Sequence, residues 1–337
     1  MTRYSRQIAV EGFGPQGQAR LQAASVLVIG AGGVAAPVLQ YLVGAGVGHV
    51  RVVDPDIVDL SNLHRQTLFR MADIGKPKAR VAAEAMTLLN PDTKITALQH
   101  AFDPANAAQL SDGMDLILDC ADSFAASYIA SDLCLVTGQP LISASIVGRS
   151  GYAGGFCGGV APGLRAIFPD LPDQLGSCAN DGVLGPSVGV VGAVQAEMAI
   201  AVLTGASPSP LGQLVTYDAD GTRFGGFRFD AATDPMPKPA FIAATDVRPD
   251  DFLIDLRAVD EAGPALPQPA IRHSVDSFAP GGPTPKTDQR AVLACRSGLR
   301  AWRAAQRLST YWTGEVKLIA LGDRPGDSPG NTQGDTP

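Results

Sequence analysis

A glycine-rich turn between two apolar segments constrains the fold of this chain more than any other feature. Residues 26–29 read Val-Leu-Val-Ile, which is typical of a buried parallel strand, and glycines crowd residues 30–33. Apolar residues then recur at helical spacing, and a second apolar run at 50–53 ends at Asp54. This strand–turn–helix–strand pattern predicts an α/β fold that binds a nucleotide at the turn.

The small and acidic residues of this pattern have physical roles. Gly30 permits the tight turn, Gly32 lets the backbone approach a phosphate, and Ala35 allows close packing of helix and strand. Asp54 lies 24 positions after Gly30, about where a carboxylate meets a ribose hydroxyl in dinucleotide-binding domains. On these residues alone, an NAD-dependent oxidoreductase with a Rossmann domain is an alternative.

Composition excludes several classes of protein. The 337 residues allow about two domains, and 45% hydrophobic with 18% charged residues is typical of a soluble globular chain. A net charge of −7 argues against nucleic-acid binding. The longest apolar stretch, 188–203, contains Gln195 and Glu197, so we expect a buried helix and no membrane span. We expect a cytoplasmic protein with reduced thiols, because the five cysteines form no Cys-x-x-Cys pair.

The rest of the chain alternates between strands and helices. Further strands are expected at residues 94–98, 114–119, 141–145, 152–156, 214–217, 224–229, 252–255, 291–294 and 316–320. Residues 169–187 are rich in Pro, Gly, Asp and Ser, which predicts a crossover loop. We place a linker at 231–245, a second and smaller α/β domain at 246–322, and a disordered tail at 323–337.

Three charged side chains follow strands at the same edge of the predicted sheet. Arg65 and Lys78 come after the second strand, and Asp122 comes after the strand at 114–119. A nucleoside triphosphate needs fixed cations, and Mg²⁺ prefers oxygen ligands, so this set favours a triphosphate–magnesium site. The alternative is that Arg65 and Lys78 are solvated surface charges.

Six segments closely resemble the ThiF/MoeB family, the bacterial relatives of ubiquitin-activating enzymes. They are residues 3–7, 30–33, 54–56, 61–66, 75–78 and 119–122. The likeness covers about residues 1–230 and implies a Rossmann-like mixed sheet that forms an adenylation domain. It implies ATP-dependent adenylation of the C-terminal glycine of a small ubiquitin-like sulfur carrier ending in Gly-Gly, with release of pyrophosphate. It also implies a homodimer in which Arg6 reaches the site of the partner subunit.

The resemblance assigns roles at the nucleotide. Asp54 would bind the ribose, and Asp122 would bind Mg²⁺. Asn62, Arg65 and Lys78 would hold the phosphates. The whole nucleotide site that the resemblance implies comprises Gly30, Gly32, Gly33, Asp54, Ser61, Asn62, Arg65, Gln66, Lys78, Asp122 and Ser123.

The chain departs from the family pattern at several positions. Ser123, Ser127 and Ser131 stand where the family usually has Asn, Arg and Asn, which alters the polar contacts near the nucleotide. Many members carry two Cys-x-x-Cys pairs for structural zinc. Gly163 and Ala166 stand where the first pair is expected, and no second pair follows. We therefore expect no zinc, because four thiolates supply the binding energy of such a site.

The cysteines of the first domain fall into two groups. Cys178 lies in a segment that resembles the family's crossover loop, whose cysteine takes the carrier as a covalent adduct. The alternative is that Cys178 is an accessible thiol without a role. Cys120, Cys134 and Cys157 lie in apolar patterns and are expected to be buried.

The second domain carries its own cysteine motif. Residues 255–257 and 295–300 closely resemble a rhodanese domain, and such domains donate persulfide sulfur to the carrier. Cys295 precedes a predicted helix, whose N-terminus lowers the pKa of a thiol. A cysteine desulfurase would then supply the sulfur. The domain is short, and residues 279–286 are a Pro/Gly stretch, so a non-catalytic rhodanese-like domain is an alternative.

The pathway follows from the carrier, which the residues do not identify. We favour a ThiS-like carrier of thiamine thiazole biosynthesis, because the zinc pairs are missing. A MoaD-like carrier of molybdopterin synthesis and a carrier for tRNA thiolation use the same chemistry. A scaffold that binds the carrier without activating it is the non-enzymatic alternative.

Overall fold

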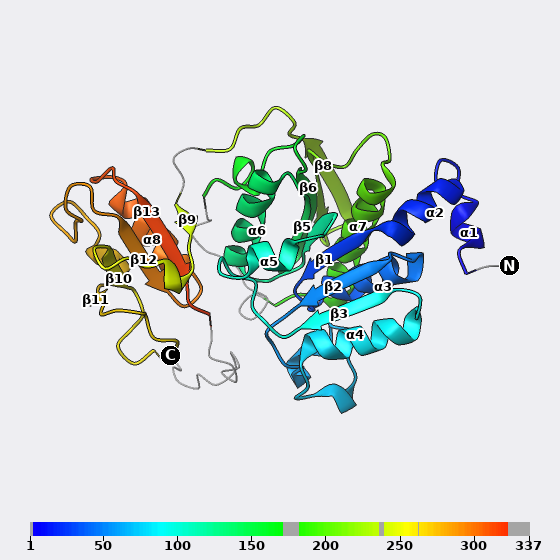
Figure 1. The fold of residues 1–337 in the computed structure, drawn as a ribbon, viewed down its shortest axis with the longest axis horizontal. Coiled ribbons are helices and arrows are strands. Elements are labelled where there is room, and N and C mark those ends of the chain that lie inside the picture. Colours follow the sequence, from blue (N-terminus) through cyan, green and yellow to red (C-terminus); the bar gives the residue numbers. More distant parts are fainter. Residues whose placement is uncertain (1–2, 171–181, 236–238, 262, 323–337) are drawn as a thin grey trace. The chain divides into compact units, whose positions relative to one another are not determined.

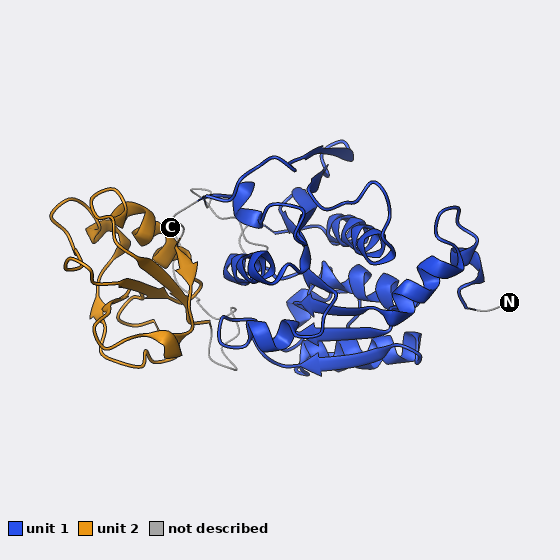
Figure 2. Ribbon diagram, turned by 45° about the horizontal axis from the view of Figure 1, so that its top comes forward, with its two compact units in different colours: residues 1–236 blue, residues 237–337 orange. Residues whose placement is uncertain are grey.

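The chain folds into two compact units, residues 1–236 and 237–337 (Figure 2). The computed structural model describes residues 3–170, 182–235, 239–261 and 263–322. Cys178 and the predicted tail at 323–337 lie outside the described residues.

An eight-stranded mixed sheet forms the centre of the first unit (Figure 1). Its strand order is β3-β2-β1-β4-β5-β6-β7-β8, parallel as far as β5 and antiparallel beyond it. The strands are β1 Ser25–Ile29, β2 His49–Val53, β3 Lys94–Leu98, β4 Leu116–Asp119, β5 Pro140–Val147, β6 Ser150–Cys157, β7 Gln213–Asp218 and β8 Arg223–Arg228. The predicted α/β class with a mixed sheet is confirmed.

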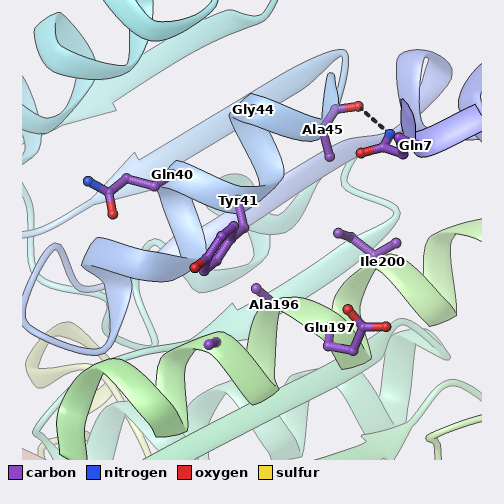
Figure 3. Close-up of a pocket in the computed structure, with 9 residues that line it drawn as sticks. Gln7, Gln40, Tyr41, Gly44, Ala45, Ala196, Glu197 and Ile200 are labelled. Carbon is purple, nitrogen blue, oxygen red and sulfur yellow. Dashed lines mark hydrogen bonds between the residues drawn. The ribbon is translucent and has the colours of Figure 1, made fainter. Parts of the chain in front are cut away.

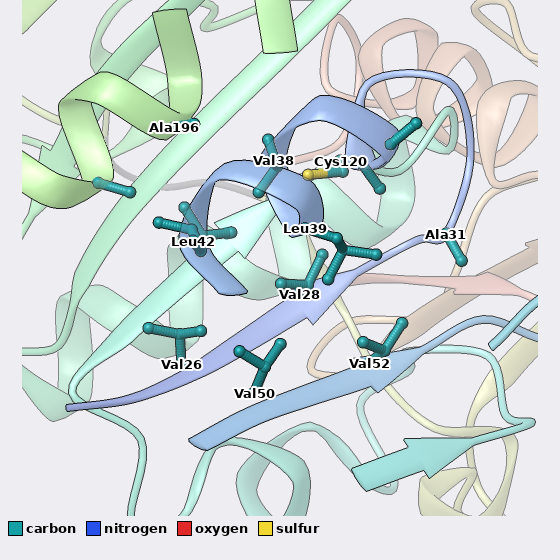
Figure 4. Packing of buried hydrophobic residues seen from close by; sticks show 14 of the residues in the cluster. Val26, Val28, Ala31, Val38, Leu39, Leu42, Val50, Val52, Cys120 and Ala196 are labelled. Carbon is teal, nitrogen blue, oxygen red and sulfur yellow. The ribbon is translucent and has the colours of Figure 1, made fainter. Parts of the chain in front are cut away.

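Three helices pack together on this sheet. Val26 and Val28 of β1 alternate with Leu27 and face a core that α3, α4 and α7 share, as Figure 4 shows for α3. The helices of the unit are α1 Ser5–Ile8, α2 Gly14–Ala23, α3 Ala35–Ala45, α4 Lys78–Leu89, α5 Ala107–Ser111, α6 Phe124–Thr137 and α7 Gly185–Thr204, with short 3₁₀ turns η1 Leu60–Asn62, η2 Met71–Asp73 and η3 Leu164–Ala166. The first turns of α3 and α4 therefore lie at the carboxyl edge of the parallel strands.

Helix α7 is long and apolar enough to cross a membrane by length and composition. Its mean hydropathy is 1.6, and 44% of its most apolar window is buried. In this fold it packs against α3, β5 and β6, and its buried Gln195 donates to the carbonyls of Asp119 and Ile142. These contacts are those of a core helix in a globular domain.

The second unit is a five-stranded parallel sheet of order β11-β10-β12-β13-β9. Its elements are β9 Ala240–Phe241, η4 Ala244–Asp246, β10 Phe252–Asp255, β11 Ile271–Arg272, η5 Val275–Ser277, β12 Ala291–Cys295, α8 Leu299–Leu308 and β13 Val316–Ala320. Described residues at both ends of the expected linker, 231–245, make regular contacts. Asp234 accepts a hydrogen bond from the Gly163 N–H within the first unit, and β9 pairs with β13 in the second.

Candidate active site

The carboxyl ends of β1, β2 and β4 meet at the glycine turn. The Gly30 N–H donates to the carbonyl of Val53 at 2.8 Å, and the Cys120 N–H donates to Ile29 at 2.9 Å. Gly30 has φ +90°, and a Cβ there would lie 2.9 Å from the Cys120 carbonyl oxygen. The close approach of β4 therefore requires glycine at this position.

Asp54 is buried directly under this turn. Its Oδ2 accepts a hydrogen bond from the Ala31 N–H at 2.7 Å, and its Oδ1 accepts one from the Asp56 N–H at 2.8 Å. Burial raises the pKa of Asp54 to about 6, although the nearby Lys78 acts in the opposite direction. A carboxylate oxygen has two lone pairs, so each can still accept from a ribose hydroxyl.

Lys78 is not the solvated surface charge of the alternative interpretation. Its side chain is 8% exposed, and its Nζ lies 2.8 Å from Oδ2 of Asp56. Its backbone N–H donates to the Asp56 carbonyl at 2.9 Å, where α4 begins. The structure thus buries an ammonium group beside Asp54, at the edge where phosphates are expected.

The segment before Lys78 brings polar side chains to the same edge. Asp59 accepts from the N–H and the hydroxyl of Ser61, and its N–H donates to Oδ1 of Asn62 at 3.1 Å. These bonds form the η1 turn, after which Arg65 donates to the Ser61 carbonyl at 3.1 Å. Ser61 and Asn62 therefore shape the loop that holds the Arg65 guanidinium.

Gln66 is buried against the glycine turn. Its Nε2 lies 3.8 Å from the position of a Cβ at Gly32, and its Oε1 has no hydrogen-bond partner among the residues that the structure describes. A buried amide oxygen without a partner is costly, so this atom is suited to accept from a ligand at the turn.

Gly33 has a role that the sequence did not reveal. A Cβ at Gly33 would lie 2.7 Å from Cγ1 of Val188, and one at Gly185 would lie 2.6 Å from the His64 carbonyl oxygen. The first turns of α7 therefore press against the glycine turn and the residue before Arg65. Both glycines permit close packing of this helix at the edge of the site.

Asp122 and Ser123 follow β4 and are exposed at the same sheet edge. Mg²⁺ is commonly held by one or two carboxylates together with substrate phosphates, and Asp122 fits that donor set. No group of three or more His, Cys, Asp or Glu that could hold a metal occurs in the described parts of the chain.

Asp119 supports this turn from within the sheet, and the sequence reasoning did not assign it a role. Its Oδ2 accepts from the Ser143 hydroxyl at 2.7 Å, and its Oδ1 accepts from the Ala121 N–H at 3.2 Å. Burial raises its pKa to about 6. Gln195 of α7 binds its carbonyl at 2.8 Å. The sequence signal for this contact was a polar residue in each of two apolar runs: Asp119 at the end of 114–119, and Gln195 within 188–203.

Arg6 does not join this cluster within one chain. It is exposed on α1, whose Gln7 donates to the carbonyl of Ala45, the last residue of α3. Because α3 runs back from the glycine turn, its end lies at the opposite, amino edge of the sheet. A cavity of about 350 Å³ lies at that edge between α3 and α7, beside Tyr41 and Glu197 (Figure 3).

The residues at the expected zinc position do not fit zinc. Asp234, which follows β8, accepts from the Gly163 N–H at 2.9 Å. Ser131 is buried, and its hydroxyl accepts from the Leu164 N–H at 2.8 Å. The Asp234 carboxylate thus joins the segment after β8 to the turn at Gly163, and the Ser131 hydroxyl of α6 holds the same turn.

Cys295 corrects one expectation. It ends β12 and is buried, and the Ala301 N–H of α8 donates to its Sγ at 3.4 Å. Burial raises the pKa of this thiol and outweighs the backbone donors and Arg300, which act to lower it. The expected cradle exists, but the expected lowering of the pKa is wrong, because the thiol is shielded from water. Cys120, Cys134 and Cys157 are buried, as expected.

The fold and this site define a nucleotide-binding α/β domain of the Rossmann-like class. The chain belongs to the ThiF family, whose sequence profile matches residues 4–236.

Three relatives illustrate the similarity. The chain is 41% identical to the sulfur carrier protein adenylyltransferase of Thermus thermophilus over 226 residues, 65% of this chain and 83% of that protein. It is 41% identical to adenylyltransferase and sulfurtransferase MOCS3 of Bos taurus, over 64% of this chain and 48% of that protein. It is 40% identical to adenylyltransferase and sulfurtransferase UBA4 of Yarrowia lipolytica, over 60% of this chain and 52% of that protein. The chain thus spans about half the length of the latter two.

Solved structures support the fold. Escherichia coli MccB with ATP matches with a TM-score of 0.60 at 20% identity, over 70% of this chain and 73% of MccB. MccB in complex with N-formylated MccA matches with a TM-score of 0.61 at 21% identity, over 70% of this chain and 74% of MccB. At this identity the likeness shows the fold alone.

Proposed function

We propose that this protein adenylates the C-terminal glycine carboxylate of a small ubiquitin-like sulfur carrier, using ATP and Mg²⁺ and releasing pyrophosphate. The observation that carries the proposal is the buried ammonium of Lys78 beside Asp54, at the glycine turn of a ThiF-family domain. The name of the Thermus thermophilus relative supports the same reaction. An oxidoreductase would leave the Lys78 and Arg65 cations without a task.

The site performs this reaction by placement and charge neutralisation. The carrier carboxylate is already ionised at neutral pH, so its attack on the α-phosphate needs no general base. Asp54 orients the ribose, while Lys78 and Arg65 offset the charge of the phosphates. Asp122 would hold Mg²⁺, which when bound would supply further positive charge to the phosphate oxygens.

Arg6 enters this proposal from a second copy of the chain. It lies at the sheet edge opposite its own site, so it contributes to catalysis only if a partner subunit presents it. A homodimer in which each Arg6 completes the other site satisfies this requirement.

The second unit is proposed to act in sulfur transfer as a rhodanese-like domain. Strand β12 of its parallel sheet ends at Cys295, just before α8, and the names of the bovine and Yarrowia lipolytica relatives include sulfurtransferase. A cysteine desulfurase would load sulfur on Cys295, and Cys178 would take part in its delivery to the carrier in the cytoplasm. ThiS-like, MoaD-like and tRNA-thiolation carriers are the three candidates.

ATP–pyrophosphate exchange tests the adenylation directly. Each of the three purified carriers is added in turn, with a version lacking the final glycine as the control. We expect exchange with one intact carrier and none with its truncated form. Absence of carrier-dependent exchange with all three would refute the proposal, and tight NADH binding without ATP binding would favour the oxidoreductase.

A matched pair of lysine variants tests the site. Lys78→Ala should lower exchange at least about a hundredfold, because a charge contact made at the reacting phosphates is lost. Lys76→Ala is the control, since the Lys76 side chain is 52% exposed and its Nζ pairs with Asp73 at 3.0 Å. Equal effects of the two substitutions on exchange would show that Lys78 is not part of the active site.

A further inference from the structure

The buried ammonium of Lys78 is paired with a carboxylate that no expected nucleotide contact explains. Its Nζ lies 2.8 Å from Oδ2 of Asp56, and the Lys78 side chain is 8% exposed while that of Asp56 is 59% exposed. The pair is therefore asymmetric. The cation is fixed in the protein, and the anion reaches it from the solvent side.

The backbone of Asp56 is held independently of its side chain. Its N–H donates to Oδ1 of Asp54 at 2.8 Å, and its carbonyl accepts from the Lys78 N–H at 2.9 Å. Ile57 and Pro77 form a bridge between the same two segments. The Asp56 carboxylate can therefore leave Lys78 without disturbing Asp54 or the start of α4.

Elementary electrostatics decides what this carboxylate does when phosphates arrive. A buried ammonium without a partner is costly, so Lys78 requires an anion in the nucleotide-free chain. A carboxylate and a phosphate close to one ammonium repel each other. The half-exposed carboxylate regains water at small cost when it moves away, whereas the buried lysine has no such freedom.

We infer that Asp56 is a positioning residue whose carboxylate pairs with the Lys78 ammonium in the nucleotide-free chain. The carboxylate leaves the ammonium when the triphosphate binds there, and it pairs with the ammonium again as pyrophosphate leaves. This inference rests on the proposed function. Asp56 keeps Lys78 oriented toward the glycine turn in the nucleotide-free chain. It also lowers the affinity for both ATP and pyrophosphate, because each must displace it.

Asp56→Asn tests this exchange without changing the shape of the side chain. Binding of MgATP no longer has to break a full ion pair, so its Kd should fall about three- to tenfold, and that of magnesium pyrophosphate should fall similarly. Isothermal titration of the full chain measures both. Glu84→Gln is the matched control: it removes a 58% exposed carboxylate from the 2.9 Å pair with Arg80 on α4 and should change Kd less than about twofold.

The same substitution in a Lys78→Ala background isolates the mechanism. If Asp56 acts through Lys78, Asp56→Asn should change the MgATP Kd by less than about twofold there. Equal tightening in both backgrounds would overturn the inference, because it would reflect general charge repulsion. Unchanged or weaker binding by Asp56→Asn alone would also overturn it.

Two further measurements distinguish a failure of this inference from a failure to fold and from a failure of the proposed function. Thermal unfolding confirms that each variant folds, and Asp56→Ser replaces Asp56→Asn if the latter does not. A wild-type chain that binds no MgATP refutes the proposed function. A wild-type chain that binds MgATP, with no tightening in either Asp56 variant, refutes this inference alone.

Discussion

Each unit of this protein joins a parallel strand to a helix through a turn with a left-handed glycine, but the two junctions have different contents. In the first unit, β1 leads to α3 through Gly30, with φ +90°. In the second, β12 leads to α8 through Gly298, with φ +85°. The first junction is surrounded by polar side chains from other segments, whereas the second encloses the thiol of its own Cys295.

The difference shows how one local geometry serves two kinds of site. Around Gly30, Asp54 and Lys78 come from later strands and helices, so the junction is built to receive a ligand from outside. Around Gly298, backbone donors of α8 already point at a buried sulfur atom. Such donors stabilise negative sulfur, yet burial raises the pKa of the free thiol.

Replacing each of the two glycines with alanine should show the largest difference between the junctions. Gly30→Ala places a Cβ 2.9 Å from the backbone oxygen of Cys120, which cannot move away, whereas Gly298→Ala meets the ring of Phe241 at 2.7 Å. We expect Gly30→Ala to lower the free energy of unfolding by about 2–5 kcal/mol and to weaken MgATP binding more than about tenfold. Gly298→Ala should leave MgATP binding unchanged. Circular dichroism and calorimetric titration measure the two effects, and equal loss of MgATP binding would remove the distinction.

Two buried carboxylates, one in each unit, should contribute opposite pH dependence to the stability of the protein. Burial raises the pKa of Asp119 to about 6, above its unfolded value of 3.8, so its contribution to stability is lost as the pH rises from about 4 to 6. Burial also opposes ionisation of Asp255, but hydrogen bonds from Arg257 outweigh it and lower the pKa. The contribution of Asp255 is therefore present above its unfolded pKa and lost as the pH falls through the lower folded value.

Two substitutions test these signs. In the wild-type chain, Asp119 should lower the free energy of unfolding by about 3 kcal/mol as the pH rises from 4 to 6, and Asp119→Asn should abolish this decrease. Asp255→Asn should lower the free energy of unfolding at pH 7. Denaturant unfolding followed by circular dichroism reports both units, while tryptophan fluorescence reports the second, because Trp302 and Trp312 are the two tryptophans of the chain. An unchanged pH profile in Asp119→Asn would contradict the assignment.

The thiol at the second junction should react slowly. Because Cys295 is buried and burial raises its pKa, we expect iodoacetamide to alkylate it at pH 7.5 at least about tenfold more slowly in the folded chain than in urea. Peptide mass spectrometry distinguishes it from the other cysteines. Equally fast alkylation in the folded chain would show that this junction is open like the first.

The smallest expected effect concerns the hydrogen bond between Asp234 and Gly163, at the position where zinc was considered. Asp234→Ala removes the bond to the Gly163 N–H and should lower the Tm by about 2–6 °C. Asp230→Ala is the control, since Asp230 is exposed and pairs with Arg228 on the surface. EDTA should leave the Tm of the wild-type chain unchanged. A chelator-sensitive Tm would overturn the expectation of a zinc-free domain.

Much of the fold could be predicted because long elements repeat their pattern. The runs at 26–29, 50–53 and 94–98 became β1, β2 and β3, since each buries alternate or continuous apolar residues. β9 and β11 were missed, because two-residue strands have no periodicity to detect. Tyr41 of α3 is largely exposed beside the cavity at the amino edge, although the apolar residues around it recur at helical spacing.

The sequence by itself determined the strand–turn–helix units, the family, and which charged residue types follow the strands. These properties are local, or are carried by short motifs in fixed order. The tertiary structure alone decided that Lys78 is buried on Asp56, that Arg6 lies at the far edge, and that the Cys295 thiol is shielded. Such facts depend on burial and on contacts between residues far apart in the chain. For the same reason the glycine turn indicated a nucleotide, while only the packing around it showed which charges meet there.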